Sequence, residues 1–137
     1  MKTNLFFWFI LIGFLTNCNS PNNSKSSYTP IGLRIENGYR KWQWASTKQF
    51  ESFTVTLANR TSEDFQMVKY RIILYVNEDG TKREIFSKSF EYYQRLNAGD
   101  IIQVTIAELA GYYMGVDVSK NENWSFAADI EDAKPIK

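Results

Sequence analysis

The chain has 137 residues, with 16 Lys and Arg against 15 Asp and Glu, and it contains no His. This length suits one domain with a short appendage, and the balanced charge gives no reason to expect nucleic acid as a partner. Without His, the commonest general base and the commonest metal-binding imidazole are missing, and a single Cys cannot form an intramolecular disulfide or a Cys-based zinc site.

The N-terminal segment has the pattern of a secretory leader. Lys2 supplies a positive charge, and residues 5–15 read LFFWFILIGFL, a run without any charge. Such a run is shorter than the roughly 20 apolar residues that cross a bilayer, and it is typical of the apolar region of a signal peptide. We therefore expect residues 1–17 to be a signal peptide.

The residues that follow this run read Leu-Thr-Asn-Cys and end at Cys18. This tetrapeptide resembles the lipobox of bacterial lipoproteins, with Asn17 where Gly, Ala or Ser is usual. The resemblance implies that Cys18 carries a diacylglycerol and becomes the first residue of the mature protein, anchored to a membrane. Asn19 is not the Asp that often retains lipoproteins at an inner membrane, so the resemblance implies the outer membrane of a Gram-negative bacterium. An ordinary secretory signal with a chance Cys is the alternative.

Residues 18–30 are expected to be the lipidated Cys and a flexible tether. Positions 19–30 read NSPNNSKSSYTP, a stretch rich in Ser, Asn and Pro with almost nothing to bury. The folded domain is expected to occupy residues 31–137.

From Ile31 onward, apolar residues alternate with a period of two, which is typical of strands. The first half of this region predicts a strand at 31–35, a turn at Asn37-Gly38, a strand containing Trp42 and Trp44, a strand at 53–57 and a polar turn at 59–64.

The strongest strand is predicted at 68–76, with Lys69 and Arg71 on its wet face and its second half apolar on both faces. A hairpin turn at 77–80 leads to a returning strand at 82–93. A turn at 96–100, a strand at 102–106, an ambiguous segment at 107–114 and a final strand with Trp124 in the core complete the pattern.

These elements amount to about seven strands over about 100 residues, with turns every 8 to 12 residues. The expected fold is therefore all-β, an immunoglobulin-like antiparallel β-sandwich. A small closed barrel is the rival arrangement.

The segment from residue 53 to residue 106 resembles the FxLYD-type β-sandwich of bacterial lipoproteins. Leu74-Tyr75 matches the family's Leu-Tyr pair, and Asp79-Gly80 matches its acidic-Gly hairpin. The segment 96–99 matches a later Leu-x-x-Gly turn, whereas Ile72 and Val76 stand where the family has Phe and Asp. The resemblance implies a sandwich fold and an envelope location. It implies no activity, because such domains carry no shared catalytic residues.

No catalytic residue, cofactor or metal site is predicted. The acidic pairs lie in or beside predicted turns, where neighbouring carboxylates are usually solvated, and no Gly-x-Ser-x-Gly motif is present. A Ser–Lys dyad stays open because both residue types are common. Asp129 and Glu131 alternate on the last strand, which indicates its wet face more simply than a calcium site.

Aromatic residues near turns are the candidates for contacts with a partner or ligand. Tyr and Trp are favoured at interfaces, and adjacent residues of a strand point to opposite faces, so one member of a Tyr-Tyr pair is expected to be exposed. The alternative is core and sheet-face packing. The candidates are Tyr39, Trp42, Tyr112 and Tyr113.

Together these features predict a lipid-anchored binding or scaffolding module of the cell envelope, without catalytic activity, that docks on a protein partner. This hypothesis predicts an exposed apolar patch or an unpaired sheet edge. A binder of a glycan, peptide or small molecule would instead need a concave aromatic cavity of roughly 300 Å³ or more. An inhibitor or immunity lipoprotein would need a projecting loop, for which 112–114 is the candidate.

Overall fold

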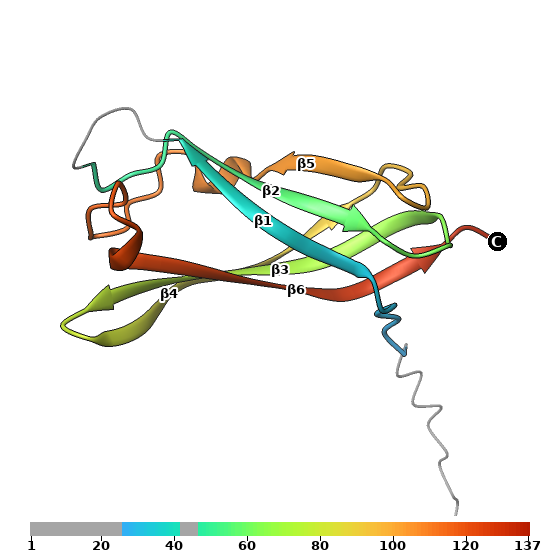
Figure 1. The fold of residues 1–137 in the computed structure, drawn as a ribbon, viewed down its shortest axis with the longest axis horizontal. Coiled ribbons are helices and arrows are strands. Elements are labelled where there is room, and N and C mark those ends of the chain that lie inside the picture. The colour runs from blue at the N-terminus through green and yellow to red at the C-terminus, as the bar shows by residue number, and fades with distance from the viewer. Residues whose placement is uncertain (1–25, 42–46) are drawn as a thin grey trace, which may run out of the picture.

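The computed structural model describes residues 26–41 and 47–137. This part of the chain forms two three-stranded sheets, ordered β1-β2-β5 and β4-β3-β6, in which all neighbouring strands are antiparallel. The two sheets lie face to face (Figure 1). The predicted antiparallel β-sandwich is confirmed. The strands are β1 (Leu33–Lys41), β2 (Ser52–Asn59), β3 (Phe65–Glu78), β4 (Thr81–Tyr92), β5 (Ile101–Thr105) and β6 (Trp124–Pro135), with two 3₁₀ helices, η1 (Ala107–Leu109) and η2 (Asn121–Asn123).

The strand order is that of an immunoglobulin-like sandwich. In the usual lettering, β1, β2 and β5 correspond to strands A, B and E, and β4, β3 and β6 correspond to C′, C and F. The last immunoglobulin strand, G, pairs with F in that architecture. It has no counterpart in 26–41 or 47–137, so β6 ends its sheet there.

The core follows from the alternation in β3. Tyr70, Ile72, Leu74 and Val76 are buried, whereas Lys69 and Arg71 lie on the outer face, as predicted. Trp124 is also buried, as predicted, and its indole N–H donates to the carbonyl oxygen of Val118 at 3.1 Å. A second cluster closes the other end of the sandwich and consists of Leu33, Leu57, Phe65, Val68, Leu96 and Ala133.

The predicted turn at Asn37-Gly38 is wrong. Strand β1 continues through these residues, and its register against β2 shifts between Ile35 and Asn37, which makes a β-bulge at Glu36. Gly38 instead allows the Phe126 ring to pack against the backbone of β1, because a Cβ at this position would lie 2.7 Å from ring atoms of Phe126. The predicted strand containing Trp42 and Trp44 lies outside the described residues.

Gly38→Ala is expected to lower the free energy of unfolding by about 2 kcal/mol, the usual cost of overpacking a well-filled site. The added methyl group would displace the Phe126 ring, which packs edge-on against Phe53 with centroids 5.6 Å apart. Urea unfolding of the single variants and of Gly38→Ala combined with Phe126→Leu measures the effect. If the Phe126 ring is the obstacle, the two losses will be less than additive, whereas full additivity would contradict this explanation.

The predicted hairpin after β3 is confirmed. Glu78 pairs with Thr81, which leaves Asp79-Gly80 as a two-residue turn. Both turn residues have positive φ, 50° and 78°, as a tight hairpin of this length requires. The ambiguous segment 107–114 forms η1 followed by a loop.

Candidate binding site

The two adjacent tyrosines after η1 have different surroundings. The Tyr112 hydroxyl donates to the carbonyl oxygen of Ile85 at 2.9 Å, and its ring packs edge-on against Phe86. The side chain of Tyr113 is 61% exposed, and that of Met114 is buried. Tyr113 is therefore the member of this loop that is available for contacts, while its neighbours on both sides fix the loop to the domain.

Of the other residues singled out by the sequence, only the backbone of Tyr39 lies in the described part of the structure. Tyr39 lies in β1 opposite Thr54, but its side chain is outside the described part of the structure. Trp42 and Cys18 lie outside the described residues altogether. Of the four candidates, Tyr113 is therefore the one whose ring is described and exposed.

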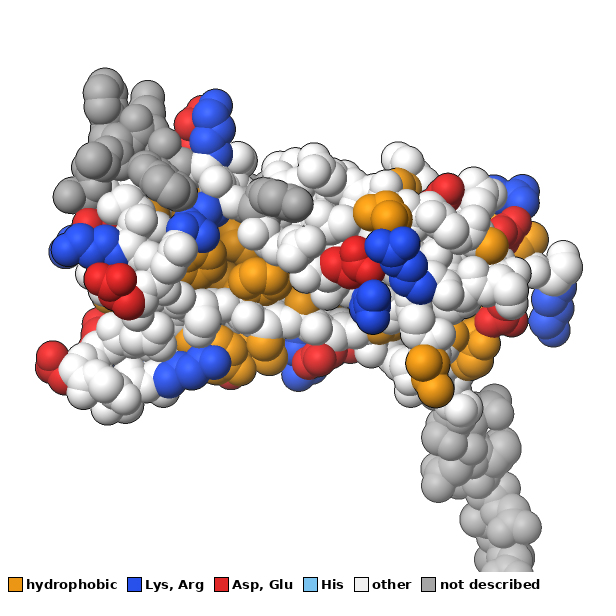
Figure 2. Space-filling view, viewed as in Figure 1, with side chains coloured by type: hydrophobic (Ala, Val, Ile, Leu, Met, Phe, Trp, Pro, Cys, Tyr) orange, Lys and Arg blue, Asp and Glu red, His pale blue; other side chains and the backbone are white. Residues whose placement is uncertain are grey.

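A groove that sequence reasoning did not locate runs between β1 and β6, which are edge strands of different sheets. We call it the β1–β6 groove. It contains a hollow of about 300 Å³ near Trp124 and a second of about 290 Å³ near Asp129. Figure 2 looks onto this side of the molecule and shows hydrophobic side chains between the two strands. The first hollow is lined by Gly38, Arg40, Asn121, Trp124, Ser125 and Phe126, and the second by residues 29–35 and 128–130.

A guanidinium group lies at the Trp124 end of this groove. The guanidinium of Arg40 lies 4.8 Å from the centroid of the Trp124 ring, and it donates to the side-chain oxygen of Asn121. Burial lowers the pKa of Arg40, but an arginine still keeps its charge at neutral pH. This end therefore combines an apolar floor with a cation, an arrangement that favours an apolar segment carrying an acidic residue.

A separate hollow, of about 470 Å³, lies between β4 and β5, the opposite pair of sheet edges. Tyr70 and Phe90 stack in its wall with centroids 5.8 Å apart. An ion pair of 3.1 Å between Lys88 of β4 and Glu108 of η1 crosses this hollow. We call this cavity the β4–β5 hollow.

Two pKa values are shifted in the β4–β5 hollow. Burial, helped by the negative charge of Glu108, raises the pKa of Tyr70 to about 12. A backbone hydrogen bond at Glu108 itself, and then Lys88, lower the pKa of the Glu108 carboxyl. The Tyr70 side chain is buried, so the polar groups that the wall offers to a ligand are the paired Lys88 and Glu108.

On the outer face of the β4-β3-β6 sheet, two cations share one carboxylate. Arg71 contacts Glu131 at 2.9 Å and Lys69 contacts it at 3.5 Å. The Ser89 hydroxyl, and then these two cations, lower the pKa of Glu131. Within residues 26–41 and 47–137, no group of three or more His, Cys, Asp or Glu side chains is placed to hold a metal ion.

The described residues include no helix with the length and apolar character needed to span a membrane. Comparisons with models of known protein families, with curated proteins and with solved structures find no match to this chain.

Proposed function

We propose that this protein is a lipid-anchored binding or scaffolding module of the bacterial cell envelope, without catalytic activity, that docks on a protein partner. The observation that carries the proposal is the β1–β6 groove, where two sheet edges border an apolar floor. Unpaired strand edges and apolar patches of this kind are the surfaces that proteins use to bind other chains.

The chain before β1 contacts one end of the domain. The backbone N–H of Tyr28 donates to Asp132 at 2.8 Å, and its hydroxyl donates to Glu63 at 2.5 Å. The described chain thus meets the domain near the C-terminal end of β6 (Figure 1). An anchor at Cys18 would leave the Trp124 end of the groove at the far end of the sandwich.

Cys18→Ser is expected to abolish incorporation of a clickable fatty acid into the protein, because the thiol is the acceptor of the diacylglycerol in the lipobox resemblance. Labelling in growing cells, followed by in-gel detection, measures the effect. Ser20→Ala, two positions beyond the acceptor, is the control and should label normally. Persistent labelling of the Cys18→Ser protein would place the acyl group elsewhere.

The partner is sought by chemical crosslinking of the intact protein in its native membrane, followed by mass spectrometry. We expect one stoichiometric protein partner. A verified crosslinking reaction that yields no partner from well-expressed protein would contradict the docking function.

The β4–β5 hollow supports a second candidate function, the binding of a soluble glycan, peptide or small molecule. Its volume of about 470 Å³ exceeds the roughly 300 Å³ at which ligand pockets begin, and the half-buried Phe90 provides aromatic surface. A thermal-shift screen of glycans and metabolites tests this function. A hit whose stabilising effect is lost in Lys88→Ala would favour this hollow over the groove.

A further inference from the structure

We propose that the partner docks by strand addition: an extended segment of the partner pairs with the free edge of β6 along Trp124–Ala128 and inserts alternate apolar side chains into the β1–β6 groove. This inference rests on the proposed docking function and names the chemistry of the partner.

The free edge of β6 supplies the backbone groups for such pairing. In the described part of the chain, β3 is the one strand with which β6 pairs. Alternate N–H and C=O groups of an edge strand therefore point away from the sheet and can pair with another strand. The stretch Trp124–Ala128 spans about 17 Å, enough for a five-residue partner strand.

This stretch lacks the features with which proteins usually protect sheet edges, namely charges, bulges and short length. Its sequence, WSFAA, has no charged residue, and the register shifts between β3 and β6 all fall beyond it. Of the other edges, β1 has a bulge at Glu36 and β4 carries charges along its length, while β5 is the shortest strand, with five residues against twelve in β6. The charged residues of β4 are Lys82, Arg83, Glu84, Lys88 and Glu91.

The groove beside this edge fits the side chains of an added strand. Trp124, Phe126 and Ala128 pair with buried residues of β3 and so face the core side, at the floor of the groove. A strand paired with β6 would project every second side chain over that floor. The position is also the one that strand G occupies in complete immunoglobulin-like sandwiches.

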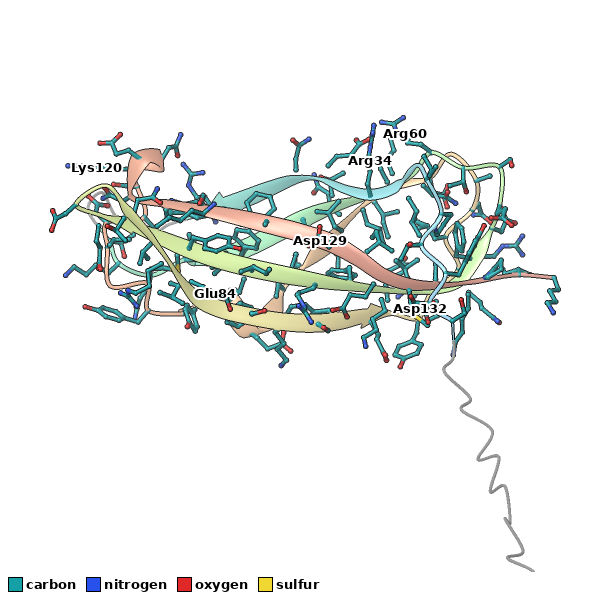
Figure 3. The ribbon with its side chains drawn as sticks, turned by 90° about the horizontal axis from the view of Figure 1, so that it is seen from below. Arg34, Arg60, Glu84, Lys120, Asp129 and Asp132 are labelled. Atoms are coloured by element: carbon teal, nitrogen blue, oxygen red, sulfur yellow. The ribbon has the colours of Figure 1, made fainter. Side chains whose placement is uncertain are left out.

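The charges around the groove narrow the choice of occupant. Arg40 and Lys120 lie at the Trp124 end, and Asp129 follows Ala128 on β6; Figure 3 labels Lys120 and Asp129. Charge complementarity favours a segment with an acidic residue beside the exposed Lys120. The chain's own tether does not fit, because residues 19–30 contain Tyr28 as their one large apolar residue. The proposed occupant is a segment of another protein, with apolar residues at alternate positions.

The test places the photo-crosslinking residue benzoyl-phenylalanine at single positions of the full-length protein in its native membrane. Ser125 lies on the free edge of β6 and Asp129 directly follows it, whereas Glu84 on β4 and Tyr113 lie away from this edge. We expect Ser125 and Asp129 to crosslink to one segment of one partner, at residues about four apart, because paired strands advance together. Mass spectrometry of the crosslinked peptides reads the spacing and the alternation of apolar residues.

Matched substitutions test the groove itself, with crosslinking from Asp129 as the readout. Ala128→Lys, which puts a long side chain into the groove, should lower the yield about tenfold, because an added strand would have to displace that side chain. Lys120→Glu, on an exposed residue, should lower it by a smaller factor. Ala110→Lys, an equal change at an exposed alanine outside the groove, should leave the yield unchanged. Thermal unfolding confirms that each variant is folded.

Other results would contradict either strand addition alone or the docking function as well. Crosslinks to a protein from Glu84 or Tyr113 alone would overturn strand addition and leave the docking function standing. Crosslinks from Ser125 and Asp129 to scattered or helically spaced residues would also overturn it, as would crosslinks to a second copy of this chain. No protein crosslink from any of the four positions would overturn the docking function as well.

Discussion

Asn59→Ala is expected to lower the free energy of unfolding by about 3 kcal/mol, because it leaves several buried backbone groups without partners. The Asn59 side chain is fully buried at the end of β2. Its amide N–H groups donate to the carbonyl oxygens of Glu63 at 2.8 Å and Asn97 at 2.9 Å. Its side-chain oxygen accepts hydrogen bonds from the backbone N–H and the hydroxyl of Thr61. One side chain thus joins the turn after β2 to the turn before β5.

Urea unfolding measures this loss. Asn37→Ala is the matched control, since Asn37 is exposed in β1 and its replacement should change the stability by less than about 0.5 kcal/mol. A loss below about 1 kcal/mol for Asn59→Ala would mean that water replaces the lost hydrogen bonds, and the two turns would then be held together by other contacts.

Leu74→Ala is expected to lower the free energy of unfolding by about 2 to 5 kcal/mol, the range for truncating a fully buried leucine. Leu74 has no exposed surface and lies between Phe86 of β4 and Phe126 of β6 in the sheet register. Ile73→Ala, on the opposite face of the same strand, is the control and should cost about 1 kcal/mol. Equal losses for the two variants in urea unfolding would contradict the assignment of the two faces.

Strands and their faces were predictable because the determining pattern is local. The alternation around Leu74 identifies a buried face within one strand, and Asp79-Gly80 identifies a two-residue hairpin from two adjacent residues. The burial of Trp124 followed from its phase with Phe126 in the same way. These features need no knowledge of which strands become neighbours.

The prediction that was wrong and the features that the sequence did not reveal depend on contacts between distant segments. Asn37-Gly38 has the local signature of a turn, but Gly38 is required by the ring of Phe126, which is far away in the sequence. The β1–β6 groove exists because β1 and β6 end different sheets, and this order is decided by pairing across the whole chain. The uncharged stretch WSFAA is a signal that could have indicated an open edge, but only once its position in the sheet is known.

The measurement that tests the open edge most directly is backbone amide hydrogen exchange, followed by NMR in the full mature chain without a partner. Along Trp124–Ala128, slow and fast amides should alternate, because every second N–H points away from β3. The amides of the facing residues 72–76 of β3 should all exchange slowly, since this strand is paired on both sides. Uniformly slow exchange along Trp124–Ala128 would show that the edge is already covered, and would contradict docking at β6.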